Sequence, residues 1–410
     1  MSLVVAKFGG TSVADVERIE RAAEKIAREV EAGNQVAVVV SAMSGVTNQL
    51  VGHCDSISKL YDLREYDVVV SSGEQITSGL MAMALQKRGI PARSWLGWQI
   101  PFKTTDMHGK ARITDIETDE LHKRLKDGEV AVIPGFQGVT DANRISTLGR
   151  GGSDTSAVAV AAALGADRCD IYTDVDGIYT TDPRIVPGAR KLNKISFEEM
   201  MELASLGSKV LQTRSVEIAM KKGMALQVLS SFEDHIGSDM PGTLVVNEEE
   251  IMEEELVSGI AASRNEAKIT LLRVQDVPGI AAKVFSPLGK AGVNVDMIVQ
   301  NISPDGKTTD MTFTVGRTDL PRALEAVKEL DIEYDEILSA DNVSKVSIVG
   351  VGMTSHSGVA EKMFSTLADK GINIQVISTS EIKISVLIEE DYTELAVRAL
   401  HAAYGLEEAA

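Results

Sequence analysis

The sequence contains few aromatic residues, few cysteines and fewer basic than acidic side chains. Aromatic residues make up 4% of the chain, so we do not expect base-stacking surfaces for single-stranded nucleic acid. The net charge of −19 also argues against a nucleic-acid backbone as a partner. Cys54 and Cys169 have no metal-ligand spacing, and we expect two buried, reduced thiols in a cytoplasmic protein.

Long apolar runs are also lacking. The most apolar helical stretch, residues 157–164, is far too short to cross a membrane, and we expect no secretion signal. The 410 residues, 44% of them hydrophobic and 25% charged, are enough for two or three globular domains. We therefore predict a multidomain protein with no membrane or nucleic-acid partner.

Apolar strand-like runs alternate with helical stretches in the first part of the chain. Candidate strands cover residues 4–8, 36–40, 130–133, 168–173 and 226–229, and candidate helices cover 15–30, 75–88, 118–126, 154–164, 197–206 and 215–222. This alternation predicts an α/β domain over residues 1–247, with a mainly parallel sheet covered on both faces. An acidic stretch follows, and we expect residues 248–264 to form a solvated linker.

An internal repeat occupies the rest of the chain, with one copy over residues 265–338 and the other over 339–410. The copies align without a gap at Gly279/Gly358, Ala281/Ala360, Lys283/Lys362, Phe285/Phe364, Leu288/Leu367, Gly292/Gly371 and Asn294/Asn373. Strand-like and helical segments follow in the order βαββαβ, which predicts two small ferredoxin-like domains. We expect the pair to share one extended sheet surface, within a chain or between chains.

A lysine and two glycines follow the first candidate strand, as Lys7-Phe8-Gly9-Gly10. Glycine lets the backbone approach a bulky anion, and the free N–H groups of the following helix favour negative charge. This pattern indicates a phosphate site. Alone it would also fit a tight turn with a solvated lysine.

Two further polar segments follow. Ser41 to Thr47 is a loop rich in small hydroxyl residues, which can donate to phosphate or to a polar substrate, although such loops are common turns. Glu74 lies directly before the candidate helix of residues 75–88, where it could cap that helix or bind a substrate ammonium group.

The most specific segment is Gly149-Arg150-Gly151-Gly152-Ser153-Asp154, directly before an alanine-rich helix. Arg150 offers a planar fork for a carboxylate or phosphate, and the glycines leave room for a ligand. Ser153 and Asp154 could be ordinary helix caps, but capping requires neither the arginine nor the glycines.

The segment from Thr173 to Arg184 follows another strand and carries several acidic residues. These could bind ribose or lie near a metal-bound phosphate, whereas the spacing does not fit a calcium loop. Lys209 adds a cation at a plausible helix end, where an isolated lysine is most often a surface charge. Elsewhere, Gly306-Lys307-Thr308 resembles the end of a P-loop but lacks its first glycine. Residues 149–154 do not match the dinucleotide-binding motif, because Asp154 occupies the position of its third glycine.

These motifs, taken in order, closely resemble those of the aspartate kinases, and the repeats resemble ACT domains, a family of amino-acid-sensing modules. The resemblance covers nearly the whole chain. It implies an amino-acid-kinase fold and transfer of the γ-phosphoryl group of ATP to the β-carboxylate of L-aspartate. That reaction opens the pathway to lysine, threonine and methionine, and Mg²⁺ would accompany ATP, held by its phosphates rather than by a set of protein ligands.

The resemblance also implies a role for individual residues. Lys7 would neutralise the transferred phosphoryl group, and Asp154 would orient the lysines and the metal-linked groups. The implied ATP-binding residues are Lys7, Gly9, Gly10, Ser41, Thr173, Asp174, Tyr179, Asp182, Pro183, Arg184 and Lys209. The implied aspartate-binding residues are Thr47, Glu74, Arg150, Gly151, Gly152 and Ser153, with Glu74 on the ammonium and Arg150 on a carboxylate.

In ACT domains the ligand lies at the loop after the first strand and at the start of the first helix. The resemblance therefore implies that lysine or threonine binds at Asp276, Gly279, Ile280, Ala281, Asn294, Asp296, Gln300, Thr379 and Glu381. We expect a homo-oligomer formed through the ACT domains, and a separate regulatory subunit could start at Met252. A plain packing role for the repeats is the alternative.

Two other functions remain open from the sequence alone. An acetylglutamate or glutamate 5-kinase would share the fold, although the paired repeats and Glu74 argue against it. A non-catalytic amino-acid sensor would keep the repeats, but it has no need for Lys7, Arg150 and Asp154 together.

Overall fold

The computed structural model describes residues 2–100, 102–206, 210–251, 256–303 and 306–407. They form two compact units. The first contains residues 2–178, 191–204 and 210–251, and the second contains 179–190, 205–206 and 256–407. Among these residues, no helix combines the length and the apolar character that a membrane span requires. Cys54 and Cys169 are free and buried, as predicted.

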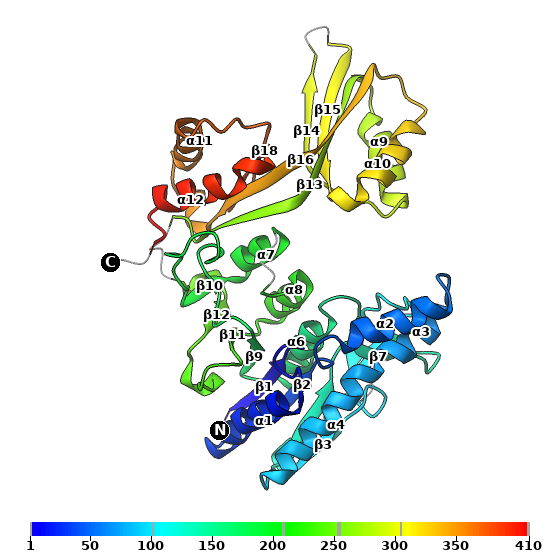
Figure 1. Cartoon of the computed structure of the whole chain (residues 1–410), viewed down its shortest axis with the longest axis vertical. Coiled ribbons are helices and arrows are strands. Elements are labelled where there is room, and N and C mark those ends of the chain that lie inside the picture. The colour runs from blue at the N-terminus through cyan, green and yellow to red at the C-terminus, as the bar shows by residue number, and fades with distance from the viewer. Residues whose placement is uncertain (1, 101, 207–209, 252–255, 304–305, 408–410) are drawn as a thin grey trace. The chain divides into compact units, whose positions relative to one another are not determined.

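The first unit is built on an eight-stranded sheet in the order β10-β12-β11-β9-β1-β2-β6-β3 (Figure 1). The strands are β1 (Leu3–Phe8), β2 (Gln35–Val40), β3 (Ala92–Ser94), β6 (Val130–Pro134), β9 (Arg168–Thr173), β10 (Lys194–Ser196), β11 (Leu226–Ser230) and β12 (Thr243–Val246). Neighbouring strands run parallel except for the antiparallel pair β11–β12. The mainly parallel sheet is therefore confirmed.

Helices cover both faces of this sheet. The helices of the unit are α1 (Val16–Glu31), α2 (Val46–Ile57), α3 (Leu63–Val70), α4 (Ser72–Lys87), α5 (Asp119–Lys126), α6 (Gly152–Leu164), α7 (Phe197–Ser205) and α8 (Thr213–Lys222). Apolar residues of α1 and α4, including Ile26 and Met81, form one core with alternate strand residues such as Val38 and Val132. Helix α6 packs on β1, β2 and β9 outside this core, against the opposite face.

A smaller four-stranded sheet in the order β5-β4-β7-β8 adds to the first unit. Its strands are β4 (Phe102–Thr104), β5 (Ile113–Ile116), β7 (Gln137–Thr140) and β8 (Ile145–Thr147). The sequence analysis predicted neither this sheet nor α2 and α3. Strands of three or four residues are too short to show a period of two.

The second unit contains one six-stranded antiparallel sheet in the order β14-β15-β13-β16-β18-β17. The strands are β13 (Gly259–Gln275), β14 (Val295–Ile302), β15 (Thr308–Val315), β16 (Glu336–Val349), β17 (Val376–Thr379) and β18 (Lys383–Glu389). The helices are α9 (Ile280–Lys290), α10 (Leu320–Lys328), α11 (Val359–Asp369) and α12 (Thr393–Ala403). The two repeats therefore share one sheet within the chain.

The long strands β13 and β16 belong to both repeats. The second half of β13 opens the first repeat, while its first half pairs residues 259–263 with 345–349 of the second repeat. In the same way the first half of β16 closes the first repeat. Residues 259–263, which the sequence analysis assigned to the linker, are thus the fourth strand of the second ACT domain.

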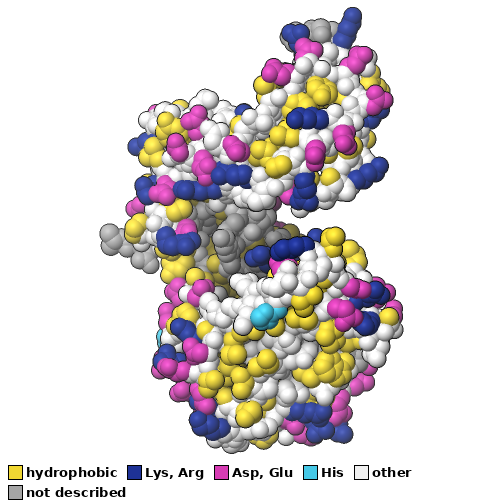
Figure 2. All heavy atoms as spheres, turned by 45° about the vertical axis from the view of Figure 1, so that its right-hand side comes forward, with side chains coloured by type: hydrophobic (Ala, Val, Ile, Leu, Met, Phe, Trp, Pro, Cys, Tyr) yellow, Lys and Arg dark blue, Asp and Glu magenta, His cyan; other side chains and the backbone are white. Residues whose placement is uncertain are grey.

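Residues 179–190 also differ from the sequence expectation, because they pack with the second unit although they interrupt the first. Val186 and Ala189 are buried in a core with Val346 and Leu400. Thr180 Oγ1 lies 2.9 Å from Nε2 of the buried His401. On the face that Figure 2 shows, acidic and basic side chains are mixed over each unit.

Candidate active site

The candidate site lies where four parallel strands end. Strands β9, β1, β2 and β6 are neighbours, and Tyr172, Phe8, Val40 and Pro134 lie in register near their carboxyl ends. The residues that follow therefore meet at one edge of the sheet. Ligand sites in open α/β sheets characteristically occur at this edge.

Three helices begin beside the same edge. The N-caps of α2 and α6 are Gly45 and Gly151, which have no side chain to cap the helix, and Ser71, the N-cap of α4, makes no side-chain capping bond. Uncapped N–H groups at a helix N-terminus attract anions. The arrangement favours a ligand that carries carboxylates or phosphates.

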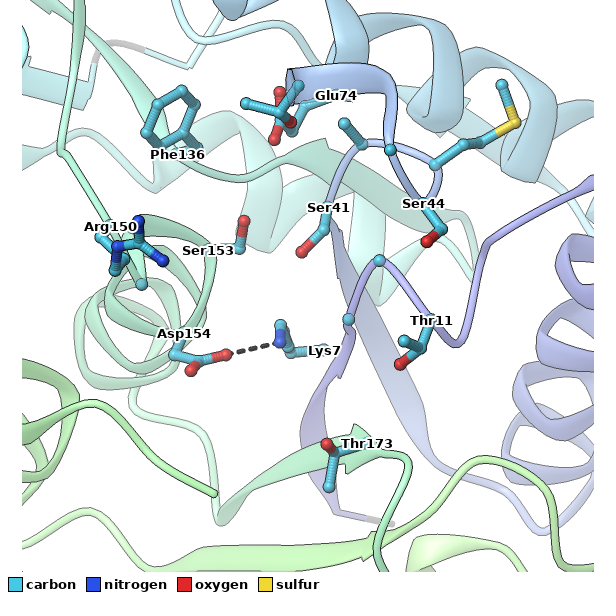
Figure 3. Close-up of a pocket in the computed structure, with 18 of the residues that line it drawn as sticks. Lys7, Thr11, Ser41, Ser44, Glu74, Phe136, Arg150, Ser153, Asp154 and Thr173 are labelled. Carbon is cyan, nitrogen blue, oxygen red and sulfur yellow. Dashed lines mark ion pairs between the residues drawn. The ribbon is translucent and has the colours of Figure 1, made fainter. Parts of the chain in front are cut away.

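A cavity of about 470 Å³ opens between these strand ends and helix N-termini (Figure 3). It lies wholly within the first unit. Its lining residues are Lys7, Gly9, Gly10, Thr11, Ser41, Ala42, Met43, Ser44, Gly45, Thr47, Glu74, Phe136, Gly149, Arg150, Gly151, Gly152, Ser153, Asp154, Thr173 and Val210.

Lys7 and Asp154 form an ion pair across the cavity floor. Lys7 Nζ lies 2.5 Å from Asp154 Oδ1, and the two side chains are only 9% and 11% exposed. Lys7 comes from the end of β1 and Asp154 from the first turn of α6. The aspartate therefore holds the ammonium group at a fixed place beside the glycines that follow β1.

Glycines permit the close packing around this pair. A Cβ on Gly9 would lie 3.2 Å from Lys7 Nζ, and one on Gly10 would lie 3.1 Å from the Ala42 carbonyl oxygen. Gly151 has φ +73°, and a Cβ there would lie 2.0 Å from Gln212 Cγ. Only glycine fits at Gly151, both for its backbone conformation and for space.

Glu74 is a buried acid that faces the cavity. Its side chain is almost inaccessible, and Oε2 has no hydrogen-bond partner among the described residues. Burial raises the pKa of Glu74 to about 7, although backbone N–H groups of Ala42 and Glu74 work in the opposite direction. A cation in the cavity would supply the missing partner and favour the ionised carboxylate.

Arg150 is the most exposed cation of the lining. Its guanidinium has no ion pair or hydrogen bond within the part of the chain that the structure describes, and Figure 3 shows it opposite Ser41 and near Ser153. A guanidinium without a protein partner is available for an incoming carboxylate or phosphate. Glu74 and Arg150 thus present opposite charges to one small ligand.

The cavity brings together most of the residues that the sequence analysis singled out. Those present in the lining are Lys7, Gly9, Gly10, Ser41, Thr47, Glu74, Arg150, Gly151, Gly152, Ser153, Asp154 and Thr173. Asp174 is absent from the lining, and Lys209 lies outside the described residues. Tyr179, Asp182, Pro183 and Arg184 belong to the second unit, where Asp182 and Arg184 form an exposed pair at 2.6 Å. Their ATP-binding role stays a prediction.

The sequence analysis missed several residues of the site. Phe136 lines the cavity with φ +70°, which is uncommon outside glycine, yet no sequence signal marked it. Gln137, the next residue, donates to the Ser71 carbonyl at 3.1 Å and accepts from Gln75 at 3.1 Å. These bonds connect β7 to the start of α4 and so support Glu74.

The predicted effector residues lie in the second unit. Gly279 is the N-cap of α9 with φ +90°, next to Ile280 and Ala281, and Asp276 follows β13 directly. Asn294 precedes β14, which contains Asp296 and Gln300, whereas Thr379 ends β17 and Glu381 follows it.

Asp296 has a protein partner from the other repeat. Lys345 Nζ lies 2.6 Å from Asp296 Oδ2 and 3.2 Å from the buried Glu266. Burial works to raise the pKa of Asp296, but the hydrogen bond and charge of Lys345 outweigh it and hold that pKa below its ordinary value. Lys268, the equivalent of Lys345 in the first repeat, donates to Gln375 at 2.6 Å, so the repeats exchange equivalent lysine contacts.

Known protein families match three separate parts of the chain. The amino acid kinase family matches residues 2–230, and ACT domain families match residues 268–331 and 346–404. The aspartokinase of Pseudomonas aeruginosa is 57% identical over 411 residues, which cover 99% of this chain and 98% of that protein. The aspartokinase of Corynebacterium glutamicum is 48% identical over 413 residues, 99% of this chain and 97% of that protein.

Solved structures show the same likeness. The crystal structure of E. coli aspartokinase III with aspartate and ADP, in the R-state, matches with a TM-score of 0.81 at 26% identity. The structure of that enzyme with lysine and aspartate, in the T-state, matches with a TM-score of 0.75 at 27% identity. Both matches cover 98% of this chain and 99% of the other.

The first unit and its cavity therefore make this chain a member of the amino acid kinase family. The two ACT domains and the similarity over the full length define it further. The chain belongs to the aspartokinases and is an aspartate kinase with allosteric regulation through its ACT domains.

Proposed function

We propose that this protein transfers the γ-phosphoryl group of ATP to the β-carboxylate of L-aspartate, forming 4-phospho-L-aspartate and ADP. This reaction is the first step toward lysine, threonine and methionine. The observation that carries the proposal is the convergence of three features on one cavity. They are the Lys7–Asp154 ion pair, the Arg150 guanidinium without a described protein partner, and the buried Glu74 carboxylate, whose Oε2 has no described hydrogen-bond partner.

The charges of the cavity suit the two ends of aspartate. Glu74 binds the ammonium group, which gives its buried Oε2 a partner, and Arg150 binds a carboxylate in a bidentate manner. Thr47 and Ser153 add hydroxyl groups, and Gly151 and Gly152 leave room for the ligand. The second carboxylate then points toward Lys7.

Lys7 and the glycines after β1 serve the phosphoryl group. The nucleophile is an ionised carboxylate oxygen, so no general base is needed. That oxygen forms a bond to the γ-phosphorus while the bond to the β–γ bridging oxygen breaks, and ADP leaves. Phosphoryl transfer requires charge neutralisation and in-line positioning, which the ammonium of Lys7 and the Gly10 N–H provide. The N–H groups of Gly9 and Ser41 already donate to the Tyr172 and Phe8 carbonyls.

Mg²⁺ fits this cavity as a companion of ATP. Asp154 and Glu74 are the carboxylates of the described lining, and Asp154 lies on the Lys7 side, where phosphates would bind. No group of three His, Cys, Asp or Glu side chains forms a metal cage in the described chain. Asp154 would therefore contact an ion held mainly by the phosphates, which adds positive charge there.

Lysine, threonine or both are the proposed inhibitors, bound at the ACT loops. The E. coli aspartokinase III structures support this proposal, because that enzyme binds lysine in its T-state and ADP in its R-state. A helix N-terminus such as Gly279 in α9 can receive the carboxylate of an amino acid. Assembly through the ACT domains, and a regulatory subunit that starts at Met252, are part of the same proposal.

Hydroxylamine trapping tests the reaction. With ATP, Mg²⁺ and L-aspartate, the protein should form aspartyl hydroxamate at a rate that depends on both substrates. N-acetylglutamate should give a rate near background because it lacks the free ammonium group that Glu74 binds. Glutamate should also give a rate near background because its side-chain carboxylate lies farther from the ammonium group than that of aspartate. Absence of hydroxamate above background would reject the proposal, and a preference for either other acceptor would change the substrate.

Initial rates with each pathway amino acid, singly and in pairs, test the regulation. Lysine, threonine or their combination at millimolar concentration should lower the rate. Rates that stay unchanged with all of them would rule out these effectors while leaving the catalytic proposal intact.

A further inference from the structure

Asp67 is a buried acid outside the cavity that joins two separate segments of the first unit. The residue is inaccessible to solvent and lies in α3. Its oxygens accept from His108 Nδ1 at 2.7 Å, from the Gly109 N–H at 3.1 Å and from Thr147 Oγ1 at 2.5 Å. A carboxylate with this many donors is held firmly, and it holds its donors equally firmly.

On one side, Asp67 is linked to Glu74 through the junction of two consecutive helices. Helix α3 ends at Val70 and α4 begins at Ser72, so only Ser71 separates the two helices. The Ser71 N–H donates to the Asp67 carbonyl at 3.1 Å, and Gln137 holds the Ser71 carbonyl. A shift of Asp67 would therefore move the first turn of α4, which carries Glu74.

On the other side, the residues that donate to Asp67 lie beside the loop that carries Arg150. Thr147 ends β8 and lies three residues before Arg150. The turn that contains His108 and Gly109 packs closely against the loop that contains Gly149 and Arg150. A Cβ on Gly149 would lie only 3.1 Å from the Gly109 carbonyl oxygen. Since the Arg150 guanidinium itself has no described partner, the backbone of this loop determines where it lies.

We propose that Asp67 is a positioning residue for aspartate: it sets the separation between Glu74, which binds the ammonium, and Arg150, which binds a carboxylate. The inference rests on the proposed function of these two residues. A ligand held at both ends by opposite charges tolerates little change in their spacing, and misplacement by about 1 Å can cost about 100-fold in rate.

The loop has a second support that should keep it folded when Asp67 is changed. Arg214 in α8 donates to the Leu148 carbonyl at 3.1 Å and to the Ala111 carbonyl at 3.1 Å. These bonds do not involve α3 or α4. An Asp67 variant should therefore keep its loop but lose the correct spacing from Glu74.

Steady-state kinetics of Asp67→Asn, which preserves the shape of the side chain, test this inference. We expect the KM for aspartate to rise about 10-fold or more, while the KM for ATP stays within about twofold. A purely structural role would lower stability and the active fraction but leave both KM values unchanged. Unchanged KM values for aspartate and ATP in the Asp67→Asn protein, with normal turnover by the wild type, would overturn the inference and leave the proposed function standing.

A double-mutant cycle with Arg150→Ala sharpens the test. If Asp67 acts through the spacing to Arg150, adding Asp67→Asn to Arg150→Ala should change the KM for aspartate by less than about twofold. A full, additive effect in that background would contradict the inference. Wild-type protein without aspartate turnover would overturn the proposed function and this inference together.

Thr147 supplies a milder variant in case Asp67→Asn does not fold. Thr147→Val removes one donor to Asp67 and should raise the KM for aspartate about three- to tenfold, whereas Thr147→Ser keeps the hydroxyl and should restore it. Equal KM values for the two variants would count against the inference.

Discussion

Two acidic side chains of the cavity differ sharply in their surroundings. Asp154 is paired with Lys7 at 2.5 Å, whereas Glu74 is buried with one oxygen unpartnered. Without a ligand, Glu74 costs the folded protein free energy, because a buried carboxylate must either lose solvation or bind a proton. A residue kept at such a cost is typical of a binding site.

The raised pKa of Glu74 gives a pH-dependent stability. Between its ordinary value of 4.5 and about 7, the folded state binds a proton that the unfolded state releases. This group therefore lowers the free energy of unfolding as pH rises through that range, and the loss is complete above about pH 7.

Glu74→Gln removes this dependence. Without ligand, the difference in the free energy of unfolding between the variant and wild type should shift in favour of the variant by about 1–3 kcal/mol as pH rises from about 4.5 to about 8. Urea denaturation of both proteins at the two pH values measures this shift. The same variant should bind aspartate at least 10-fold more weakly. A difference between variant and wild type that does not change with pH would contradict this reading of Glu74.

At the scale of elements, the beginning of α6 concentrates the chemistry. Arg150, Gly151, Gly152, Ser153 and Asp154 all line the cavity, and the helix N-terminus points there without a side-chain cap. The glycine-rich sequence before an alanine-rich helix made this element predictable. The same holds for β1, whose apolar run ends in Lys7 and two glycines.

Other elements of the site carry no comparable local signal. Strand β8 has three residues and β7 has four, so periodicity cannot identify them. Asp67, Gln137 and Thr147 support the site through contacts between segments 41 to 80 residues apart, such as the Asp67–Thr147 bond with a separation of 80. Contacts of this kind depend on the tertiary fold, which a single sequence does not reveal.

Gly151→Ala tests the α6 element, with Gly165→Ala as the matched control at the other end of the same helix. Both glycines have positive φ, but a Cβ meets Gln212 at 2.0 Å at Gly151 and nothing within 4 Å at Gly165. We expect Gly151→Ala to cost about 2–5 kcal/mol of stability and to raise the KM for aspartate. Gly165→Ala should cost only about 1–2 kcal/mol and leave the kinetics unchanged.

Equal stability loss in the two variants, measured by thermal unfolding, would show that Gly151 is not packed as described. Unchanged kinetics in a folded Gly151→Ala protein would separate this turn from aspartate binding.

At the scale of the whole molecule, the two repeats are joined by exchanged strands. The sequence predicted the duplication and a shared sheet surface, because Gly279/Gly358 and the other matched pairs align without a gap. It did not predict that residues 259–263 complete the second repeat, since the stretch around Ser263, Arg264 and Asn265 lacks alternating apolar residues. The contacts of Lys345 and Lys268 reinforce this exchange.

These two lysines give a matched pair of variants in the second unit. Lys345→Met leaves the buried Glu266 and the more exposed Asp296 without their cation, and should cost about 2–4 kcal/mol, mainly through Glu266. Lys268→Met only frees the neutral amide of Gln375, and should cost less than about 1 kcal/mol. Calorimetric unfolding of both proteins measures the difference, and equal costs would contradict the assignment of charge pairing to Lys345.

The most direct test of the account is hydroxamate formation by Lys7→Ala at saturating ATP and aspartate. Removal of the ammonium that neutralises the phosphoryl group should lower kcat about 10²–10⁴-fold, while the dissociation constant for aspartate stays within a few-fold. Lys221→Ala, which removes an exposed lysine of α8, should retain the wild-type rate. A near-normal kcat in the Lys7→Ala protein would contradict the central role of the cavity in phosphoryl transfer.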